Sequence, residues 1–239
     1  MSNKEIKDAN DAIESWEIGQ VFDEMSDKYT DIMDHMVPHY RKLIASMLEC
    51  LPAGFKPLRI LDLGCGNGNV SAVSMALFPG AHHHLVDASE EMIGLCKTRF
   101  EGRSISYEHN LFQNLEYIPG TYDLVLAGFS LHHLDAGGKR KFFTELFPGL
   151  TETGVLACAD LFINKESEEH RHLLNDWNSF AFASGKTQED WDWVMDHYDA
   201  YDRPSAFNDQ QKWLTKAGFV HVELSWNAGH WGCFHAYKN

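Results

Sequence analysis

From residue 58 onward, short apolar runs alternate with segments whose apolar positions recur every three or four residues. The runs are LRILDLG, HHHLVDA, ISYEHN, YDLVLAGFS and GVLACADLF, which begin at residues 58, 82, 105, 122 and 154. Their lengths predict strands, and the segments between them predict helices at 69–78, 89–100 and 138–150. Continuously apolar strands that alternate with helices are typical of a parallel sheet with both faces covered. The pattern therefore predicts an α/β fold.

Two segments depart from this alternation. Residues 16–50 have the pattern of two helical pieces around Pro38, and residues 163–213 are helical, acidic and rich in large aromatic side chains. A final pair of apolar runs, FVHVELSWN and WGCFHAYKN, ends the chain. We expect a Rossmann-like, seven-stranded mixed sheet in residues 51–239, preceded by an N-terminal helical lid at 1–50. Residues 163–213 are expected as a helical cap insertion, which packs on the sheet, covers a ligand cleft, or does both.

Composition narrows the class of partner. The formal net charge of −15 opposes binding to nucleic acid, and the only basic cluster, KRK at 139–141, is interpreted as a solvated helix start. No apolar run approaches the roughly 20 residues of a membrane span, and the N-terminal residues lack the apolar core of a secretory signal. We therefore expect a cytoplasmic protein that acts on a small molecule, without a nucleic-acid or membrane partner.

The five cysteines are an odd number, and none of them form a C-x-x-C pair. This usage disfavours a disulfide framework and a cysteine-ligated zinc site. We expect reduced cysteines that are mostly buried as small apolar residues.

The stretch LDLGCGNGN places three glycines directly after the first predicted strand, at Gly64, Gly66 and Gly68. The dinucleotide fingerprint G-x-G-x-x-G fails because Asn69 stands where the third glycine belongs, and no lysine follows to make a phosphate-binding P-loop. Asp87 ends the second strand, where a carboxylate can accept both hydroxyls of a ribose. Asp62 offers a second carboxylate, which could hold an ammonium group indirectly. A nucleoside without phosphates that carries an ammonium group fits S-adenosylmethionine.

These motifs resemble those of the class I S-adenosylmethionine-dependent methyltransferases. LDLGCGNGN looks like the family's first motif, LVDASEEMI its acidic second strand, and YDLVLAGFSLHHL its fourth-strand motif. GLTETGVLACAD and WLTKAGFVHVEL are similar to its fifth strand and its late helix–strand unit. Within the class, the layout is similar to the carboxy-S-adenosylmethionine synthase type and to small-molecule methyltransferases of similar length.

The resemblance implies a set of cofactor-binding residues. Gly64, Cys65 and Gly66 would line the methionine portion, Asp87 and Ala88 would meet the ribose, and Asn110 and Leu111 the adenine. Tyr40, in the VPHY segment, would form a hydrogen bond with the cofactor, and Gly128 would form the floor of the cleft. The remaining members of the expected set are Asp62, Gly68 and Met92.

Two positions depart from the family pattern. The adenine position is usually an aspartate, but here it is Asn110, whose amide oxygen can still accept a hydrogen bond without a charge. The synthase also needs an arginine for the extra carboxylate of its cofactor. The matching stretch offers Met195, and Arg203 follows eight residues later. This difference favours plain methyl transfer.

His132 and Asp160 are the candidate catalytic pair. They follow the fourth strand and end the fifth strand, and adjacent parallel strands would bring them to the same rim. The pattern resembles methyltransferases in which a histidine is the base and an aspartate orients it. Two alternatives stay open: the HH pair, including His133, caps or packs the following helix, or the reaction needs no base because proximity suffices.

The 14 histidines give no expected metal site. The groups considered are residues 82–84, 35 with 39, 170 with 172, and 230 with 235, and each is interpreted as structural or surface-exposed. The function expected from the sequence is O- or N-methylation of a small-molecule acceptor, which releases S-adenosylhomocysteine from an enzyme that is a candidate homodimer. The alternatives are a cofactor-modifying enzyme like carboxy-S-adenosylmethionine synthase and a non-catalytic S-adenosylmethionine-binding protein.

Overall fold

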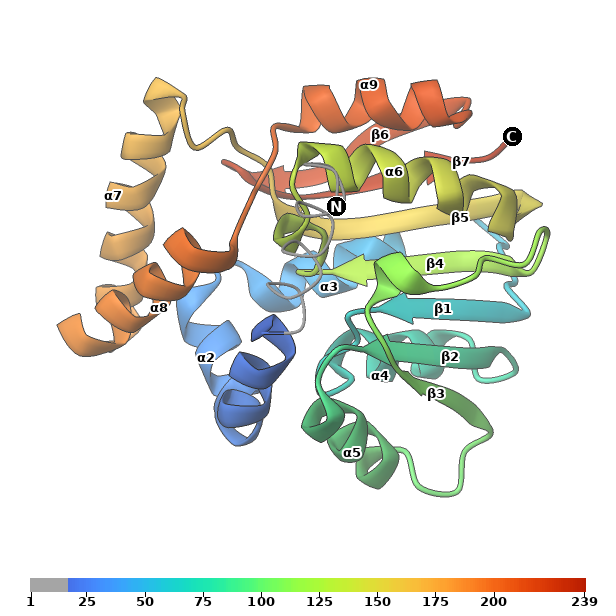
Figure 1. The fold of residues 1–239 in the computed structure, drawn as a ribbon, viewed down its shortest axis with the longest axis horizontal. Coiled ribbons are helices and arrows are strands. Elements are labelled where there is room, and N and C mark those ends of the chain that lie inside the picture. Colours follow the sequence, from blue (N-terminus) through green and yellow to red (C-terminus); the bar gives the residue numbers. More distant parts are fainter. Residues whose placement is uncertain (1–16) are drawn as a thin grey trace, which may run out of the picture.

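A seven-stranded sheet forms the centre of the protein in a computed structural model that describes residues 17–239 (Figure 1). The strands are β1 (Arg59–Leu63), β2 (His82–Asp87), β3 (Ile105–His109), β4 (Tyr122–Gly128), β5 (Leu150–Leu161), β6 (His221–Ala228) and β7 (Trp231–Tyr237). Their order is β3-β2-β1-β4-β5-β7-β6, and only β7 pairs antiparallel to its neighbours. The expected mixed α/β sheet of the Rossmann-like type is thus confirmed.

Helices cover both faces of the sheet because successive apolar residues of each buried strand point to opposite sides. Ile60 of β1 packs in one core cluster with α3 (Tyr40–Glu49) and α4 (Asn69–Leu77). Leu61 packs in another with α6 (Ala136–Leu146) and α9 (Phe207–Ala217). The helix α5 (Glu90–Arg99) packs against β2 and β3. Both faces of β1 are therefore buried under helices, as its continuous apolar run predicts.

The other helices gather at one end of the sheet. Residues 17–25 are helical, and they are followed by α2 (Tyr29–Met36), while α7 (Glu168–Ala183) and α8 (Gln188–Tyr201) come from the segment after β5. In Figure 1 these helices lie on the left, the side toward which the arrowheads of β1 and β4 point. The indole nitrogen of Trp177 on α7 donates to the carbonyl of Met36, which joins the two groups of helices.

The segments expected as lid and cap are each divided in the structure. α3 belongs to the layer that covers the sheet, so only residues 17–36 lie over the sheet end. In the same way, α9 packs on α6 and β6, which leaves α7 and α8 as the separate part of 163–213. Among the described residues, 17–239, no helix is long and apolar enough to cross a membrane.

Candidate active site

The chain turns sharply after β1, and the turn depends on glycine. Gly64, Gly66 and Gly68 have φ angles of +65°, +52° and +82°, which side chains with a Cβ rarely adopt. The amides of Gly64 and Cys65 both donate to the carbonyl of Val86, at 2.9 and 3.0 Å. These bonds hold the turn against the end of β2, at the switch point between β1 and β4 where α/β sheets bind ligands.

We expect Gly64→Ala to destabilise the protein more than Gly54→Ala. A Cβ on Gly64 would lie 2.6 Å from the Cβ of Ser130, whereas a Cβ on Gly54 would meet nothing within 4 Å. Both substitutions carry the cost of a positive φ, about 1–2 kcal/mol, so their difference isolates the overlap, worth about 1–3 kcal/mol. Urea unfolding of the two variants measures that difference, and equal losses would contradict the close packing of the turn.

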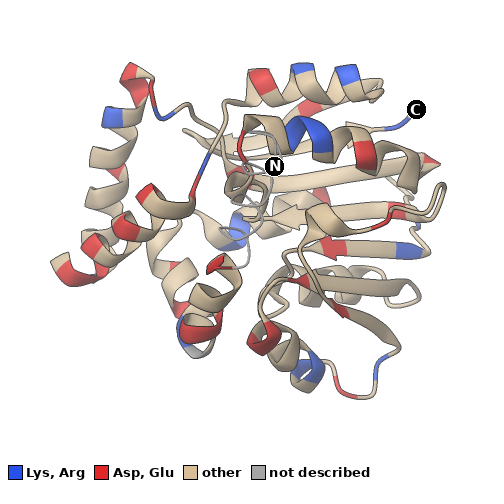
Figure 2. Ribbon diagram, in the orientation of Figure 1, with Lys and Arg blue, Asp and Glu red and all other residues tan. Residues whose placement is uncertain are grey.

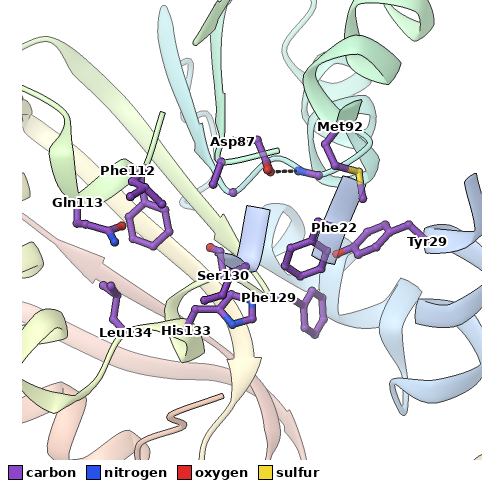
Figure 3. A pocket seen from close by; sticks show the side chains of 15 residues that line it. Phe22, Tyr29, Asp87, Met92, Phe112, Gln113, Phe129, Ser130, His133 and Leu134 are labelled. Atoms are coloured by element: carbon purple, nitrogen blue, oxygen red, sulfur yellow. Dashed lines mark hydrogen bonds between the residues drawn. The ribbon is translucent and has the colours of Figure 1, made fainter. Parts of the chain in front are cut away.

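A pocket opens beside this turn. Figure 3 shows side chains from the N-terminal helices, from the ends of β2 and β4 and from the loop after β3 surrounding it. We call it the donor pocket. It is lined by Ile18, Phe22, Tyr29, Gly64, Gly66, Asp87, Ala88, Met92, Leu111, Phe112, Gln113, Phe129, Ser130, His133 and Leu134. Six of the expected cofactor-binding residues are among them: Gly64, Gly66, Asp87, Ala88, Met92 and Leu111.

Asp87 is the carboxylate of the donor pocket. Its Oδ2 accepts a hydrogen bond from the amide of Gly66 at 2.7 Å, drawn in Figure 3, and its Oδ1 accepts one from the amide of Ser89 at 2.9 Å. Burial raises the pKa of Asp87, and these two amides act in the opposite direction. The bonds fix the carboxylate at the end of β2 and leave each oxygen a further lone pair for a ligand hydroxyl.

The other expected cofactor residues lie around the donor pocket without lining it. Asn110 directs its amide nitrogen to Glu108, 2.9 Å from Oε1, and Gly128 lies under α4, where a Cβ would be 2.7 Å from Cγ2 of Val70. Cys65 is buried in the core, and Gly68 begins α4 against the ring of Phe100.

Tyr40 also contacts the protein instead of the donor pocket. Its hydroxyl accepts a hydrogen bond from the amide nitrogen of Asn69 at 3.0 Å. The same nitrogen lies 3.0 Å from the hydroxyl of Thr30, and the amide oxygen of Asn69 accepts from Arg99 at 2.8 Å. The residue that breaks the dinucleotide fingerprint therefore links α2, α3 and α5 around the glycine turn.

Asp62 is buried in β1, and Ser71 of α4 donates to its Oδ2. Among the described residues its Oδ1 has no hydrogen-bond partner, and burial raises the pKa of Asp62 to about 7. Because this pKa is above the value in the unfolded chain, folding favours the protonated acid. The resulting stability is present at pH 4 and is lost as pH rises through about 7.

We expect Asp62→Asn to abolish this loss. One pKa unit corresponds to about 1.4 kcal/mol, so the free energy of unfolding of the wild type should fall by about 4 kcal/mol relative to the variant between pH 4 and pH 8. Urea unfolding at several pH values measures the difference. Parallel pH curves for the two proteins would contradict the raised pKa.

A second pocket adjoins the donor pocket and shares Phe22, Tyr29 and Phe129 with it. We call it the acceptor pocket. Its walls are mostly apolar and come from α2, α7, α8 and the strand ends. They are Phe22, Met25, Tyr29, Ile32, Met33, Met36, Val37, Phe129, His132, Leu161, Trp177, Trp193, Val194, His197, Tyr198, Asp202, Pro204 and Trp231. The aromatic residues of 163–213 thus both pack on the protein and wall a cavity.

His132 and Asp160 meet at the rim of the sheet, as their positions in the sequence predict. Nδ1 of His132 lies 2.5 Å from Oδ1 of Asp160, whose Oδ2 accepts the amide of His132 at 3.0 Å. His132 lies on the 3-10 turn η3 (Leu131–His133) that follows β4. Burial lowers the pKa of His132, but the carboxylates of Asp160 and Asp202 outweigh it and raise the pKa to about 9.

Sequence reasoning missed the residues that surround this pair. Asp202 Oδ1 lies 3.6 Å from Nε2 of His132, 3.3 Å from Nδ1 of His133 and 3.6 Å from Nε2 of His197. Phe22 packs its ring edge-on against His133 and His197. The HH pair was a signal for part of this cluster, but nothing in the sequence places Asp202 opposite it.

The interpretation of KRK as a solvated helix start is wrong for Lys139, which is 1% exposed. Its Nζ donates to the carbonyls of Leu134 and Arg203, and burial lowers its pKa to about 8. The amide of Arg203 in turn donates to the carbonyl of His132 at 2.6 Å. Lys139 is buried because its position on α6 faces the loop that carries His132, and these bonds hold residue 203 beside it.

Comparisons with known proteins identify the type of domain. Residues 60–154 match the family described as methyltransferase domain. The carboxy-S-adenosyl-L-methionine synthase of Photobacterium profundum is 23% identical over 221 residues, 90% of each protein. The malonyl-[acyl-carrier protein] O-methyltransferase of Bacillus anthracis is 29% identical over 119 residues, 48% of this chain and 43% of that protein.

Solved structures share the fold. The crystal structure of an S-adenosylmethionine-dependent methyltransferase from Thermotoga maritima superposes with a TM-score of 0.62 at 14% identity, covering 92% of this chain and 99% of that one. Three observations indicate the same type of enzyme: the glycine turn, the carboxylate at the end of β2 and the full-length resemblance. Residues 60–154 therefore form a class I S-adenosylmethionine-dependent methyltransferase domain, with S-adenosylmethionine as its cofactor, and the chain as a whole has a layout similar to that of the carboxy-S-adenosylmethionine synthases.

Proposed function

We propose that the enzyme transfers the methyl group of S-adenosylmethionine to an oxygen or nitrogen of a small, partly apolar acceptor. The observation that carries this proposal is the contact between the two pockets, which share the side chains of Phe22, Tyr29 and Phe129. A nucleoside held at Asp87 in the donor pocket would reach toward this shared wall. An acceptor in the second pocket would meet it from the other side.

The reaction is a displacement at carbon. A lone pair of the acceptor forms a bond to the methyl carbon while the carbon–sulfur bond breaks, and the electron pair of that bond stays on sulfur as S-adenosylhomocysteine. Enclosing both reactants supplies most of the rate by proximity and orientation. For a hydroxyl acceptor, we assign His132 as the base, with its Nε2 accepting the proton of the hydroxyl group. Only protein molecules in which the ring of His132 is neutral can accept this proton. Asp160, at 2.5 Å from Nδ1, orients the ring and stabilises its charged form.

Around the pockets, we propose that residues 17–36 act as the lid and α7 with α8 as the cap. The remaining expected cofactor residues, Tyr40, Asp62, Cys65, Gly68, Asn110 and Gly128, would then support the donor pocket from behind. The acidic surface of the cap supports a small-molecule acceptor over a nucleic acid. Figure 2 shows Asp and Glu gathered on α8, whose residues include neither Lys nor Arg. A cytoplasmic location and a homodimer stay predictions from the sequence.

One feature favours plain methyl transfer over the synthesis of a carboxylated cofactor. Among the residues whose side chains the structure describes, no Lys or Arg lines the donor or acceptor pocket. Arg203 uses its guanidinium on the carbonyls of Asp202 and Ala200 at the end of α8, at 2.9 and 2.7 Å. A second carboxylate on the cofactor would therefore lack a cationic partner, and burying an unpaired charge is costly.

Methyl-labelled S-adenosylmethionine tests the proposal. The purified protein is incubated with the labelled donor and a panel of phenols, carboxylic acids and amines, and S-adenosylhomocysteine is quantified by mass spectrometry. We expect acceptor-dependent release and a labelled product. A carboxylated form of S-adenosylmethionine that co-purifies with the protein would instead favour the cofactor-modifying alternative. Tight cofactor binding without turnover of any acceptor would favour the binding-protein alternative.

Filling the acceptor pocket should weaken acceptor binding without changing donor binding. Val37 is buried in the wall of that pocket and does not line the donor pocket. We expect Val37→Phe to raise the KM for the acceptor about tenfold or more, because overpacking a formed cavity costs about 1–3 kcal/mol. The control is Val220→Phe at a position that is 67% exposed. An unchanged KM in Val37→Phe would place the acceptor elsewhere.

A further inference from the structure

We propose that His132, His133 and Asp202 form a binding site for a divalent transition-metal ion between the donor and acceptor pockets. The ligand atoms are Nε2 of His132, Nδ1 of His133 and Oδ1 of Asp202, and they all lie within 4.8 Å of one another. The proposal departs from the expectation that the protein has no metal site. That expectation considered only histidines close together in the sequence, and Asp202 comes from the far end of α8.

The two distances from Asp202 to the histidines fit a metal ion. Oδ1 of Asp202 is 3.6 Å from Nε2 of His132 and 3.3 Å from Nδ1 of His133. Two ligands at 2.0–2.1 Å from a tetrahedral zinc ion are separated by about 3.3 Å. The observed spacing is thus too long for good hydrogen bonds and close to the separation that a shared ion requires.

Two of the three ligand atoms also lack another partner. Nδ1 of His133 and Oδ1 of Asp202 are buried, and neither has a hydrogen bond within the described residues, 17–239. An unsatisfied buried polar atom costs about 1–3 kcal/mol. The two atoms lie 3.3 Å apart, so one ion would satisfy both.

The third ligand is already held in the orientation that metal sites use. The other ring nitrogen of His132 contacts Oδ1 of Asp160 at 2.5 Å, and the amide of Leu161 donates to the same oxygen at 2.8 Å. A carboxylate behind a ligating histidine fixes its tautomer and its ring plane. This contact leaves Nε2 of His132 for the ion.

Two imidazoles and one carboxylate select an ion such as Zn²⁺, Mn²⁺, Fe²⁺ or Co²⁺ over Ca²⁺ or Mg²⁺, which prefer oxygen ligands. Three protein ligands also leave a coordination position for a further molecule, as in catalytic zinc sites. His132 and Asp202 line the acceptor pocket, so that position faces the acceptor. His197 lies on the other side of Asp202, at 3.6 Å from its Oδ1.

This inference deepens the proposed function and rests on it for its chemical role. The ion would bind a hydroxyl or carboxylate oxygen of the acceptor and position it beside the donor pocket, which His133 lines. A hydroxyl bound in this way loses its proton to water more readily, because the ion stabilises the oxyanion. The oxyanion then attacks the methyl carbon as the carbon–sulfur bond breaks. His132 would be a ligand in that case, and no protein base would be needed.

Titration of the full-length protein with Co²⁺ after removal of metal by a chelator tests the site. We expect one Co²⁺ per chain, with the visible absorption of a low-coordinate ion. His133→Gln and Asp202→Asn should each weaken binding by about 100-fold or more, since each removes a ligand atom and the carboxylate also brings the negative charge. His221→Gln is the control, because His221 is exposed and paired with Glu223. The proposal would be overturned if the wild type bound no Co²⁺, or if both ligand variants bound it as tightly as the wild type.

Methyl transfer assayed beside the titration separates the two proposals. Stoichiometric Co²⁺ binding without methylation of any acceptor would keep the metal site and remove the proposed function. Full activity in protein shown to be metal-free would overturn the role of the ion in the reaction and leave His132 as the base. If Asp202→Asn fails to fold, the wild-type titration and His133→Gln still decide.

Discussion

Replacing Asp87 with alanine is expected to lower the affinity for S-adenosylmethionine by at least about 100-fold. The carboxylate lines the donor pocket at the end of β2, where two backbone amides hold it at 2.7 and 2.9 Å. Two hydrogen bonds from ribose hydroxyls to a charged oxygen are worth about 1.5–3 kcal/mol each, and 1.4 kcal/mol is a factor of ten in affinity. Isothermal titration of the variant with S-adenosylmethionine and with S-adenosylhomocysteine measures the loss.

Asp123→Ala is a matched control for this variant. Oδ2 of Asp123 also accepts two backbone amides, those of Leu58 and Arg59, at 2.8 and 3.0 Å. It lies at the start of β4, and it does not line either pocket. Both variants therefore lose similar local bonds, but only Asp87→Ala should lose the cofactor. Equal cofactor affinity in the two variants would show that Asp87 does not hold the ribose.

The sequence predicted the sheet because its strands have strong local signals. The run at β1 is apolar on both faces, and the glycines that follow it indicate a turn without information from distant parts of the chain. Asp87 could be placed at the edge of the donor pocket for the same reason, since strand order and strand end fix its position. The bounds of two elements differ from the predicted ones: α6 ends at Leu146 before a 3-10 turn that contains Pro148, and β5 starts at Leu150, earlier than expected.

The walls of the two pockets could not be predicted, because they depend on where distant segments dock. Phe22 and Tyr29 line both pockets, yet in the sequence they are ordinary apolar positions of a helical pattern. The local sequence pattern assigns Lys139 to solvent because of its charge, although its Nζ donates to carbonyls of two loops in the structure. The contact of Asp202 with the histidines could not be predicted either, since only the packing of α8 brings it to them.

Asp160→Asn and His132→Gln are each expected to reduce kcat by about 100-fold or more while leaving the Kd of S-adenosylmethionine unchanged. Neither residue lines the donor pocket, and positioned acid–base groups contribute about 100- to 10,000-fold. Asparagine keeps the shape of Asp160 but lacks the charge beside Nδ1, so the ring of His132 loses both its orientation and its stabilised cation. Product formed after fixed reaction times at saturating S-adenosylmethionine gives kcat. Titration of the protein with S-adenosylmethionine gives Kd.

The double variant distinguishes a working pair from two independent contributions. Residues that act as a unit are strongly non-additive, so Asp160→Asn should cost little in a protein that already carries His132→Gln. Additive losses would mean that Asp160 acts through another contact, such as the amide of Leu161, whose bond to Oδ1 is 2.8 Å. If all three variants keep the wild-type kcat, methyl transfer proceeds by proximity alone, and His132 and Asp160 only shape the rim of the acceptor pocket. The cycle therefore separates chemistry at this pair from its contribution to the fold, because Kd for the cofactor reports the integrity of the neighbouring pocket in every variant.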